Sequence, residues 1–412
     1  MSLLAKRLES LQRFGWKFGL DTIRILLAEL GDPQRDLRFV HVAGTNGKGA
    51  TCAYLESILR VAGYRTGLYT SPHLISPRER FRIAGACVSR RDYERLGGQV
   101  LRACAKFPPR RQPTYFEAQT AMAFLWFREQ DVDVAIMETG LGGRLDATNV
   151  IGSPLVSLIT PVGLEHQDIL GATIEHIARE KAGILKRGCF AATIQEDLRA
   201  LGVLRERARK VGAFLAMPGE DFPVSVPVPK GRPSYDAVNA ALAVAGIRLL
   251  RHHGFRVGHD QVSCGLDSMR WPGRFEIISR RPLTILDGAH NPHASRALSC
   301  SLHERFPKTR WIVINGYLGD KDHAACVKEL EEHAFLSIVT DPPSERAGAG
   351  IRVFEAWECA GVPVLYVKDW RQALRVARIK SGGRHPILVT GSLYLVGACR
   401  EALIGTRGLE RL

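Results

Sequence analysis

Long apolar runs are missing from this sequence, and so is an export signal. No hydrophobic segment approaches the roughly 20 residues that a membrane-spanning helix needs. The N-terminal segment, MSLLAKRLESLQRFGWKFGL, mixes charged and apolar residues and lacks the apolar core and small-residue cleavage site of a signal peptide. We therefore expect a cytoplasmic protein that has no membrane partner.

Paired cysteines are missing as well. The nine cysteines of the chain are scattered, and no two of them form a Cys-x-x-Cys motif. This spacing argues against a zinc ribbon and against a disulfide framework. We expect reduced cysteines that serve as small apolar residues.

Acidic residues are in deficit, with 42 Asp and Glu against 57 Lys and Arg, which gives a formal net charge of +15. Such a charge favours anionic partners. Much of the excess is arginine spread along the chain, and no basic block interleaved with aromatic residues marks a nucleic-acid site. Anionic small molecules are therefore the expected partners, nucleic acid is not, and a monomer is the default expectation.

The chain of 412 residues is longer than a single hydrophobic core usually supports, so two domains are expected. Short apolar runs alternate with amphipathic stretches, a pattern typical of a parallel sheet covered by helices. Pro272 and Gly273 indicate a hinge and place a domain boundary near residue 277. We expect two α/β domains, 1–277 and 278–412, that face each other across a cleft. Strands are predicted over 38–44, 132–140, 154–160 and 189–194, and then over 282–290, 310–317, 334–341, 362–367 and 386–392.

A glycine-rich turn, GTNGKG, joins the strand predicted at 38–44 to an amphipathic helix predicted over 49–63. Backbone N–H groups at such a turn, together with the start of the helix, attract phosphate. The glycines let the backbone come close to a ligand, and Lys48 supplies a positive charge for the outer phosphates. A purely structural turn is the alternative. The residues expected to bind ATP here are Gly44, Thr45, Asn46, Gly47, Lys48, Gly49 and Ala50.

The order of residues in this loop resembles the ATP loop of the Mur ligase superfamily, in the form used by its folylpolyglutamate synthase and dihydrofolate synthase branch. Other segments resemble that branch in the same order and at similar spacing, from about residue 15 to about residue 400: RTGLYTSPHL, TYFEAQTAMAFLWF, ETGLGGRLDATNV, LEHQDILGATIEHIAREKAGILK, RWPGRFE, DGAHNPHA and TGSLYLVG. The resemblance implies an N-terminal P-loop ATPase-like domain with a mostly parallel sheet and a folate or pterin site. It also implies a smaller, Rossmann-like α/β domain at the C-terminus that binds glutamate.

By this resemblance Glu138 and His166 hold Mg²⁺. A carboxylate at a strand end suits that ion, whereas a lone imidazole would otherwise be read as structural. Lys181 ends a helix that Thr173 is expected to cap. In the family this lysine is carbamylated, which requires an amine that is partly neutral. The resemblance thus implies ATP and Mg²⁺ as cofactors, with K⁺ as an optional further cation, and makes Lys48, Lys181 and His290 the catalytic candidates.

One expected metal ligand is absent from the loop. The branch usually has a serine or threonine hydroxyl on magnesium where this chain has Ala50. The next side chain, Thr51, is rotated by about 100° around the helix. We therefore expect water, rather than Thr51, to complete the magnesium shell.

The remaining site residues are likewise implied by the resemblance. The nucleotide is assigned to Asn239, Arg274 and Asp287, the incoming glutamate to His290 and Ser392, and the acceptor substrate to Ser71, His73, Arg80, Arg144 and Asp146. Two departures are visible: Asp236 stands where the family frequently has glutamine, and Pro77 and Arg78 precede Glu79 where it commonly has Phe-Asn. The change at Asp236 alters one expected adenine contact, and the change before Glu79 leaves the acceptor open.

The activity implied is an ATP-dependent ligation of L-glutamate to a pteroate or folate carboxylate through an acyl phosphate. Many bacterial members of the family both make dihydrofolate and extend folates, so we expect the combined enzyme. Two alternatives stay open. One is a paralogue that ligates an amino acid to a different carboxylic acid, and the other is a nucleotide-binding protein that has lost turnover.

Overall fold

The computed structural model describes residues 3–15, 19–229 and 232–405. The chain divides into two compact units, and the last division along the sequence falls between Met269 and Arg270, whereas the sequence places a boundary near residue 277. The C-terminal residues 406–412 of the expected second domain lie outside the described ranges. Unit 1 comprises Met1–His73, Pro77–Pro229 and Asp236–Met269, and unit 2 comprises Leu74–Ser76, Lys230–Tyr235 and Arg270–Leu412.

Unit 1 is built on an eight-stranded sheet in the order β4-β3-β2-β5-β1-β6-β7-β8. Pairing is parallel from β2 through β8, and β3 runs antiparallel to both of its neighbours. The four strands predicted for this part are confirmed as β1, β5, β6 and β7. The strands are β1 (Phe39–Ala43), β2 (Thr66–Tyr69), β3 (Phe81–Ile83), β4 (Ala86–Cys87), β5 (Val134–Glu138), β6 (Val156–Ile159), β7 (Phe190–Thr193) and β8 (Phe214–Ala216).

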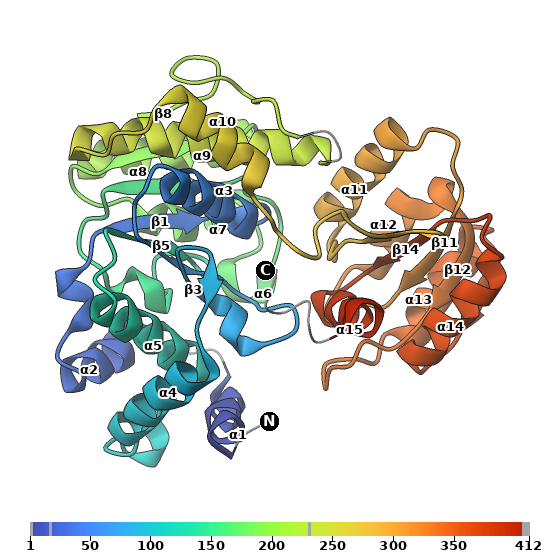
Figure 1. Cartoon of the computed structure of the whole chain (residues 1–412), viewed down its shortest axis with the longest axis horizontal. Coiled ribbons are helices and arrows are strands. Elements are labelled where there is room, and N and C mark those ends of the chain that lie inside the picture. Colours follow the sequence, from blue (N-terminus) through green and yellow to red (C-terminus); the bar gives the residue numbers. More distant parts are fainter. Residues whose placement is uncertain (1–2, 16–18, 230–231, 406–412) are drawn as a thin grey trace. The chain divides into compact units, whose positions relative to one another are not determined.

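Helices cover both faces of this sheet, with α3, α9 and α10 on one side and α4 and α5 on the other (Figure 1). The sequence predicts an apolar stripe along α3, in which Tyr54, Leu55, Ile58 and Leu59 are fully buried and Ala62 is half-buried. The helices are α1 (Leu3–Glu9), α2 (Asp21–Glu29), α3 (Lys48–Val61), α4 (Arg90–Cys104), α5 (Tyr115–Glu129), α6 (Gln167–Leu170), α7 (Ile174–Lys181), α8 (Leu198–Val211), α9 (Ser234–Leu250) and α10 (His259–Ser268), with short 3-10 turns η3 (Pro77–Arg80) and η5 (Ala147–Val150).

Unit 2 holds a smaller, six-stranded sheet in the order β13-β12-β11-β14-β10-β9, parallel except for the edge strand β9. The five strands predicted in the last third are confirmed as β10 to β14. The elements are β9 (Glu276–Arg280), β10 (Leu283–Leu286), β11 (Trp311–Asn315), β12 (Ala334–Val339), β13 (Val364–Tyr366), β14 (Ile387–Thr390), α11 (Pro292–Arg305), α12 (His323–Leu330), α13 (Gly350–Cys359), α14 (Trp370–Ser381) and α15 (Leu393–Ile404).

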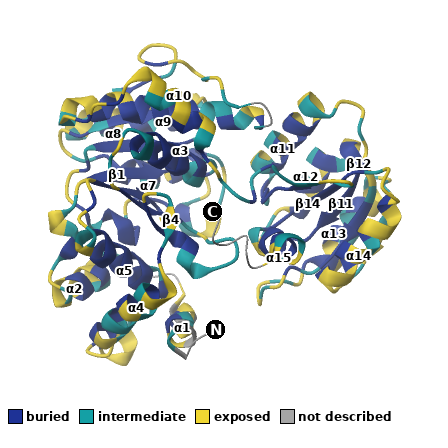
Figure 2. Ribbon diagram, in the orientation of Figure 1, coloured by how far each residue is buried: buried dark blue, intermediate teal, exposed yellow. Residues whose placement is uncertain are grey.

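The sheet of unit 2 is also covered on both faces. One apolar cluster joins it to α11, α12 and α13, and a second joins it to α14 and α15. In each unit the central strands are buried while the outer helix faces are exposed (Figure 2). The expected fold class, two α/β domains with the larger parallel sheet first, is therefore confirmed. None of the helices in the described ranges is long and apolar enough to cross a membrane.

Candidate active site

The phosphate loop lies between β1 and α3, and two of its glycines are required by geometry. Gly44 has φ +146°, and a Cβ there would lie 1.8 Å from the Oγ1 atom of Thr160. Gly47 has φ +87°, and its Cβ would lie 2.2 Å from the Oδ1 atom of Asn239. Positive φ and close contact both exclude larger residues. The loop backbone is thus packed against β6 and α9, and Asn239 lies directly beside it.

Thr45 ties this loop to the segment that follows β6. Its N–H donates to the carbonyl of Pro161 at 2.9 Å. Its hydroxyl donates to the carbonyl of Gly163 and accepts from the N–H of Gly163, each at 3.1 Å. Because His166 lies at the end of the same segment, Thr45 links the phosphate loop to a predicted metal ligand.

Two lysine side chains converge on the loop. The Lys48 amine donates to the carbonyls of Gly44 and Thr45, both at 3.0 Å. The Lys181 amine, which is buried at the end of α7, donates to the Gly44 carbonyl at 2.7 Å. Burial, and then the positive charge of Lys48, lower the pKa of Lys181 from 10.5 to about 7. A substantial fraction of this amine is therefore neutral near pH 7, which is the condition for carbamylation. The expected cap is present as well, since the Thr173 side chain accepts from the N–H of His176.

The residues expected around the metal follow the carboxyl ends of neighbouring strands, beside the phosphate loop. In the sheet order β2-β5-β1-β6, these ends lead to Ser71, Glu138, the phosphate loop and His166. Such an edge is where ligands bind in parallel α/β sheets. Glu138 is buried, and its Oε2 atom accepts from the N–H of Ser71 at 2.9 Å. His166 has φ +49°, an uncommon conformation for a residue with a side chain.

Glu138 and His166 fit a divalent ion if hydroxyls, waters and phosphate oxygens supply its other ligands. Within the described ranges, no group of three or more His, Cys, Asp and Glu side chains could hold a metal. Glu138 and His166 would therefore need further ligands, and hard cations take hydroxyls, waters and phosphate oxygens readily. Ser71 carries a hydroxyl beside Glu138, and a carbamylated Lys181 would add an anion.

The side chains of α3 that follow Lys48 do not offer an obvious substitute for the missing hydroxyl. Ala50 has no donor atom. Thr51 is fully buried, and its hydroxyl has no hydrogen-bond partner in the part of the chain that the structure describes. Ser71, which was expected to bind the acceptor, also carries a hydroxyl, and its backbone N–H donates to Glu138.

Two of the acceptor candidates form a pair. The Nε atom of Arg80 donates to the Nδ1 atom of His73 at 3.0 Å, and the Arg80 guanidinium lies 5.5 Å from the centre of the Tyr115 ring. Burial, together with the Arg80 charge, lowers the pKa of His73 to about 3. His73 is thus neutral at ordinary pH, with Nδ1 as acceptor and Nε2 as donor.

The other two acceptor candidates are engaged within the protein. Asp146 accepts from the N–H groups of Gly140 and Leu141 at 2.9 and 2.8 Å. Arg144 donates to the Oε1 atom of Glu180 from Nε and Nη2, at 3.0 and 2.8 Å. These bonds shape the loop 139–146 after β5. A cavity beside this loop is lined by residues that include Thr114, Phe116, Leu141, Leu145, Asp146 and Ala147.

In unit 2 the predicted residues gather at the carboxyl ends of β10 and β14. Asp287 accepts from the N–H groups of Phe275 and Ala289, each at 2.8 Å. Arg274 lies against Gly288, where an added Cβ would be 2.2 Å from its Nη1 atom. The Gly288 carbonyl also accepts a 2.8 Å hydrogen bond from Nδ1 of His290, which orients that ring.

Ser392 completes this group of unit 2. It caps α15, accepting from the N–H of Leu395 at 3.1 Å. Its loop is joined to that of His290, because the Gly391 N–H donates to the Ala289 carbonyl at 3.0 Å. The structure thus brings Arg274, Asp287, His290 and Ser392 together within unit 2.

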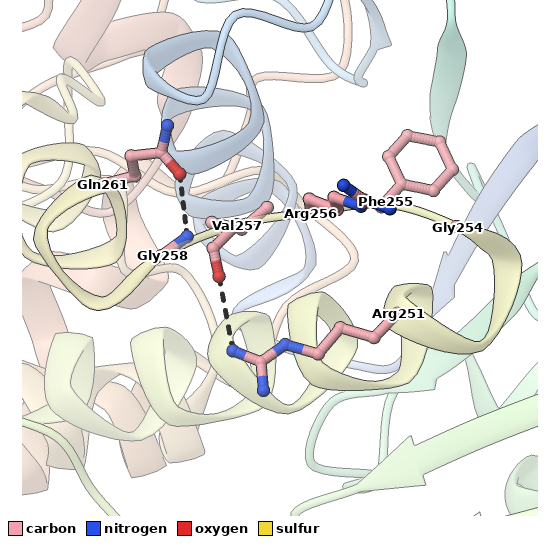
Figure 3. A pocket seen from close by; sticks show the side chains of 7 residues that line it. All are labelled: Arg251, Gly254, Phe255, Arg256, Val257, Gly258 and Gln261. Carbon is pink, nitrogen blue, oxygen red and sulfur yellow. Dashed lines mark hydrogen bonds between the residues drawn. The ribbon is translucent and has the colours of Figure 1, made fainter.

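A surface groove of about 730 Å³ in unit 1 is separate from these residues. Arg251, Phe255, Arg256, Val257 and Gln261 contribute to its lining (Figure 3). Tyr64, just beyond the end of α3, contacts it, because the Arg256 N–H donates to the Tyr64 hydroxyl at 2.7 Å. The phosphate loop lies at the other end of α3, so the groove contains none of the predicted site residues.

Sequence reasoning missed one buried polar residue near the loop, His41. His41 lies in β1, and its Nε2 atom is 2.8 Å from the hydroxyl of Thr148. A histidine within the apolar run FVHVA was the available signal. Nothing in the sequence indicated Thr148 as its partner, because the two are far apart along the chain.

Comparison with known proteins gives the class first. Residues 42–212 match the Mur ligase middle domain, and residues 273–393 match the Mur ligase glutamate ligase domain. The phosphate loop and strands β2 to β7 lie within the first match, and the group around Asp287 lies within the second. The architecture is therefore that of a Mur-type ligase.

Full-length relatives narrow this class. The dihydrofolate synthase/folylpolyglutamate synthase of Bacillus subtilis is 35% identical over 426 residues, covering 95% of this chain and 96% of the relative. A solved structure of Mycobacterium tuberculosis folylpolyglutamate synthase, complexed with ADP and AMPPCP, has a TM-score of 0.90 at 31% identity and covers 97% of this chain and 98% of its own. E. coli FolC in complex with DHPP and ADP has a TM-score of 0.86 at 31% identity, covering 98% of this chain and 99% of its own. The chain belongs to the folylpolyglutamate synthase/dihydrofolate synthase family.

Proposed function

We propose that the protein is an ATP-dependent ligase that joins L-glutamate to dihydropteroate and also extends reduced folates. The observation that carries this proposal is the phosphate loop with two lysine amines on one carbonyl, the second of them buried and partly neutral near pH 7. A loop that only bound nucleotide would have no use for the second amine. Family membership supports glutamate and a pterin carboxylate as the substrates.

The chemistry requires activation, because hydroxide is a poor leaving group. The acceptor carboxylate attacks the γ-phosphorus of ATP, the bond to ADP breaks, and an acyl phosphate forms. The glutamate amine then attacks the acyl carbon, phosphate leaves, and the amine gives up a proton. Position and electrostatics dominate such transfers, so Lys48 and the loop N–H groups would offset the charge on the transferred group.

Ser71, Glu138 and His166 would hold a divalent ion beside this loop, with carbamylated Lys181 as a further anion. When bound, that ion neutralises phosphate charge. We propose Mg²⁺ for this role and K⁺ as an optional second cation. A related synthase solved with Mn, AMPPNP and L-glutamate supports a divalent ion with nucleotide. We propose water, Ser71 or both in place of the hydroxyl that Ala50 lacks.

The remaining roles follow the two units. In unit 1, Asn239 would contact the nucleotide, and His73 and Arg80 would face the acceptor, whose pterin we place beside Phe116 and the loop 139–146. In unit 2, Arg274 and Asp287 would hold the nucleotide, and His290 and Ser392 the incoming glutamate. Arg144 and Asp146 would shape the acceptor loop rather than bind substrate directly, because their side chains already bond within the protein.

We further propose a cytoplasmic monomer whose partners are small molecules, without nucleic acid or membrane. A paralogue with a different carboxylic acid as acceptor is the second candidate. Three sequence features favour it: Ala50, the buried Asp236, and the altered segment before Arg80.

One assay separates these candidates. ADP release is measured with ATP and glutamate plus dihydropteroate, and then with ATP and glutamate plus a reduced folate. Turnover with both acceptors supports the combined enzyme, and turnover with one identifies the subtype. ATP binding without turnover on either acceptor would rule out the folate activity. Lys48→Ala, which removes the loop charge, is the matched negative control.

A further inference from the structure

His41 occupies an unusual position for a titratable side chain. It lies in the middle of β1, three residues before the phosphate loop begins at Gly44, and it is fully buried. Its Nε2 atom is 2.8 Å from the Oγ1 atom of Thr148, which lies in η5 after the acceptor loop 139–146. No predicted role in ATP, metal or glutamate binding uses either residue.

The direction of the hydrogen bonds is determined by chemistry. The Thr148 hydroxyl donates to the Oδ1 atom of Asp146 at 2.6 Å, and the Thr148 N–H donates to the same oxygen at 3.0 Å. A hydroxyl has one proton to give, so Thr148 Oγ1 must accept from His41. His41 therefore carries a proton on Nε2, and burial lowers its pKa to about 3, so the ring is neutral. A chain of donors runs from His41 through Thr148 to Asp146.

Asp146, at the end of this chain of hydrogen bonds, holds the acceptor loop 139–146 in place. The second oxygen of Asp146 accepts from the N–H groups of Gly140 and Leu141. This chain of hydrogen bonds thus orients the N–H groups of Gly140 and Leu141, which follow Glu138 and Thr139 in the sequence. Gly140 is also held against the ring of Phe116, where an added Cβ would be 2.6 Å from the ring edge. Phe116, Leu141 and Asp146 all line the cavity beside the loop.

The opposite side of the loop rests on the helix that ends in Lys181. A Cβ at Gly143 would lie 2.9 Å from the Glu180 carbonyl and 3.0 Å from the Lys181 carbonyl. The Arg144 N–H donates to the Glu180 carbonyl at 2.8 Å. Backbone contacts fix this side of the loop, and the Asp146 carboxylate holds the other side.

Simple packing does not account for His41. Its Nδ1 atom is buried and has no hydrogen-bond partner in the described part of the chain. A buried polar atom without a partner opposes folding, and an apolar residue in the same strand would avoid that cost. What the histidine adds is one donor, directed at Thr148.

We propose that His41 is a positioning residue for the acceptor substrate, acting through Thr148 and Asp146 on the loop 139–146. The inference rests on the proposed function, because the cavity wall that this loop forms is the proposed acceptor site. His41 does not touch substrate, and it leaves nucleotide binding to the phosphate loop. Its loss therefore affects the acceptor and not ATP.

The test compares His41→Phe, which removes the donor, with His41→Gln, whose amide nitrogen can reach the same position. In His41→Phe the KM for the acceptor rises about tenfold, the order expected when one hydrogen bond is lost, while the KM for ATP stays at the wild-type value. His41→Gln restores most of the acceptor KM. Thr148→Val reproduces the His41→Phe effect, and the two changes combined are no worse than either alone.

Hydrogen exchange supplies a readout that does not depend on turnover. The amides of Gly140 and Leu141 exchange about tenfold faster in His41→Phe and Thr148→Val than in wild type, and His41→Gln slows them again. His323→Phe is the control, because His323 is also buried and hydrogen bonded, to the Leu318 carbonyl in unit 2. It leaves both amides unchanged.

The outcomes are distinct. Wild-type loop protection in both His41→Phe and Thr148→Val overturns the inference, whether or not the protein turns over folates. A parallel rise in the KM values for ATP and acceptor also overturns it, because that pattern indicates a general structural defect. Silence of the wild-type enzyme with both acceptors refutes the proposed function, while the exchange data still decide whether His41 positions the loop.

Discussion

The amines of Lys48 and Lys181 share one acceptor, the carbonyl oxygen of Gly44, at 3.0 and 2.7 Å. Two ammonium groups so close would repel each other, and burial disfavours the charge on Lys181 further. This repulsion is removed if Lys181 loses its proton or becomes an anionic carbamate. The phosphate loop therefore makes the modification of Lys181 electrostatically favourable and keeps Lys48 as its permanent charge.

The first prediction concerns this modification. Wild-type protein exchanged with ¹³C-labelled bicarbonate should show a carbamate signal in the ¹³C spectrum, and Lys181→Arg should not, because a guanidinium stays protonated. ADP release by Lys181→Ala should fall by about a hundredfold or more, as for loss of a group that stabilises developing charge. Added formate or acetate should restore part of this activity by supplying the missing anion. Full activity of Lys181→Arg would contradict the prediction.

The second prediction concerns acid stability. The pKa of His73 is lowered from 6.5 to about 3 by burial and by Arg80, so the folded protein keeps this ring neutral. In the unfolded chain the ring takes up a proton as the pH falls below 6.5, and the unfolded state is then favoured. The free energy of unfolding should therefore decrease as the pH falls from 6.5 toward 3.

The His73→Asn variant isolates this contribution, because asparagine keeps an acceptor for Arg80 and does not titrate. Urea unfolding at about pH 7 and about pH 5 should show a smaller loss of stability in the variant than in wild type. Equal losses in both proteins would mean that His73 is not held neutral.

The third prediction concerns Gly47. Gly47→Ala places a Cβ 2.2 Å from the Oδ1 atom of Asn239 at φ +87°, so the loop must shift. ATP affinity should weaken by about tenfold or more, since phosphate contacts depend on the loop backbone. Gly152→Ala is the control, because nothing lies within 4 Å of its Cβ position. Isothermal titration with ATP makes the comparison, and similar affinities for both variants would count against the loop geometry.

The fourth prediction concerns the missing hydroxyl. Ser71→Ala should raise the Mg²⁺ concentration needed for half-maximal ADP release about tenfold, because Ser71 lies beside Glu138 and offers a hard oxygen ligand. Thr51→Ala should cause a modest loss, and Ala50→Ser should lower the Mg²⁺ requirement. A collapse of turnover in Thr51→Ala alone would identify Thr51 as the ligand instead.

The sequence was informative wherever a pattern is local. All nine predicted strands are present, because each is a short, mostly apolar segment ended by polar or glycine residues. The strands that were missed are short or lie at sheet edges, such as β4, which has two residues, and β9, whose residues are half-buried or exposed. Their pairing depends on neighbours distant in the chain, which no short window of sequence contains.

The candidate site shows the same division. The phosphate loop, the end of β5 and the capped helix before Lys181 were all readable from local motifs. The links from Thr45 to Gly163 and from His41 to Thr148 each join residues more than a hundred positions apart, so only the folded chain reveals them. The nine cysteines are free, as expected, but Cys264, Cys300 and Cys359 are exposed rather than packed in a core. These three lie within helices, where exposure depends on tertiary packing.

The reciprocal hydrogen bonds between Thr45 and Gly163 bear on how this enzyme can be recombined with its relatives. These bonds join the segment that follows β1 to the segment that follows β6, although the two segments are far apart along the chain. A chimera that imports the phosphate loop from a relative should therefore import the segment from Thr160 to His166 with it. Exchanging one segment without the other would remove the hydrogen bonds between Thr45 and Gly163 and misalign the two segments.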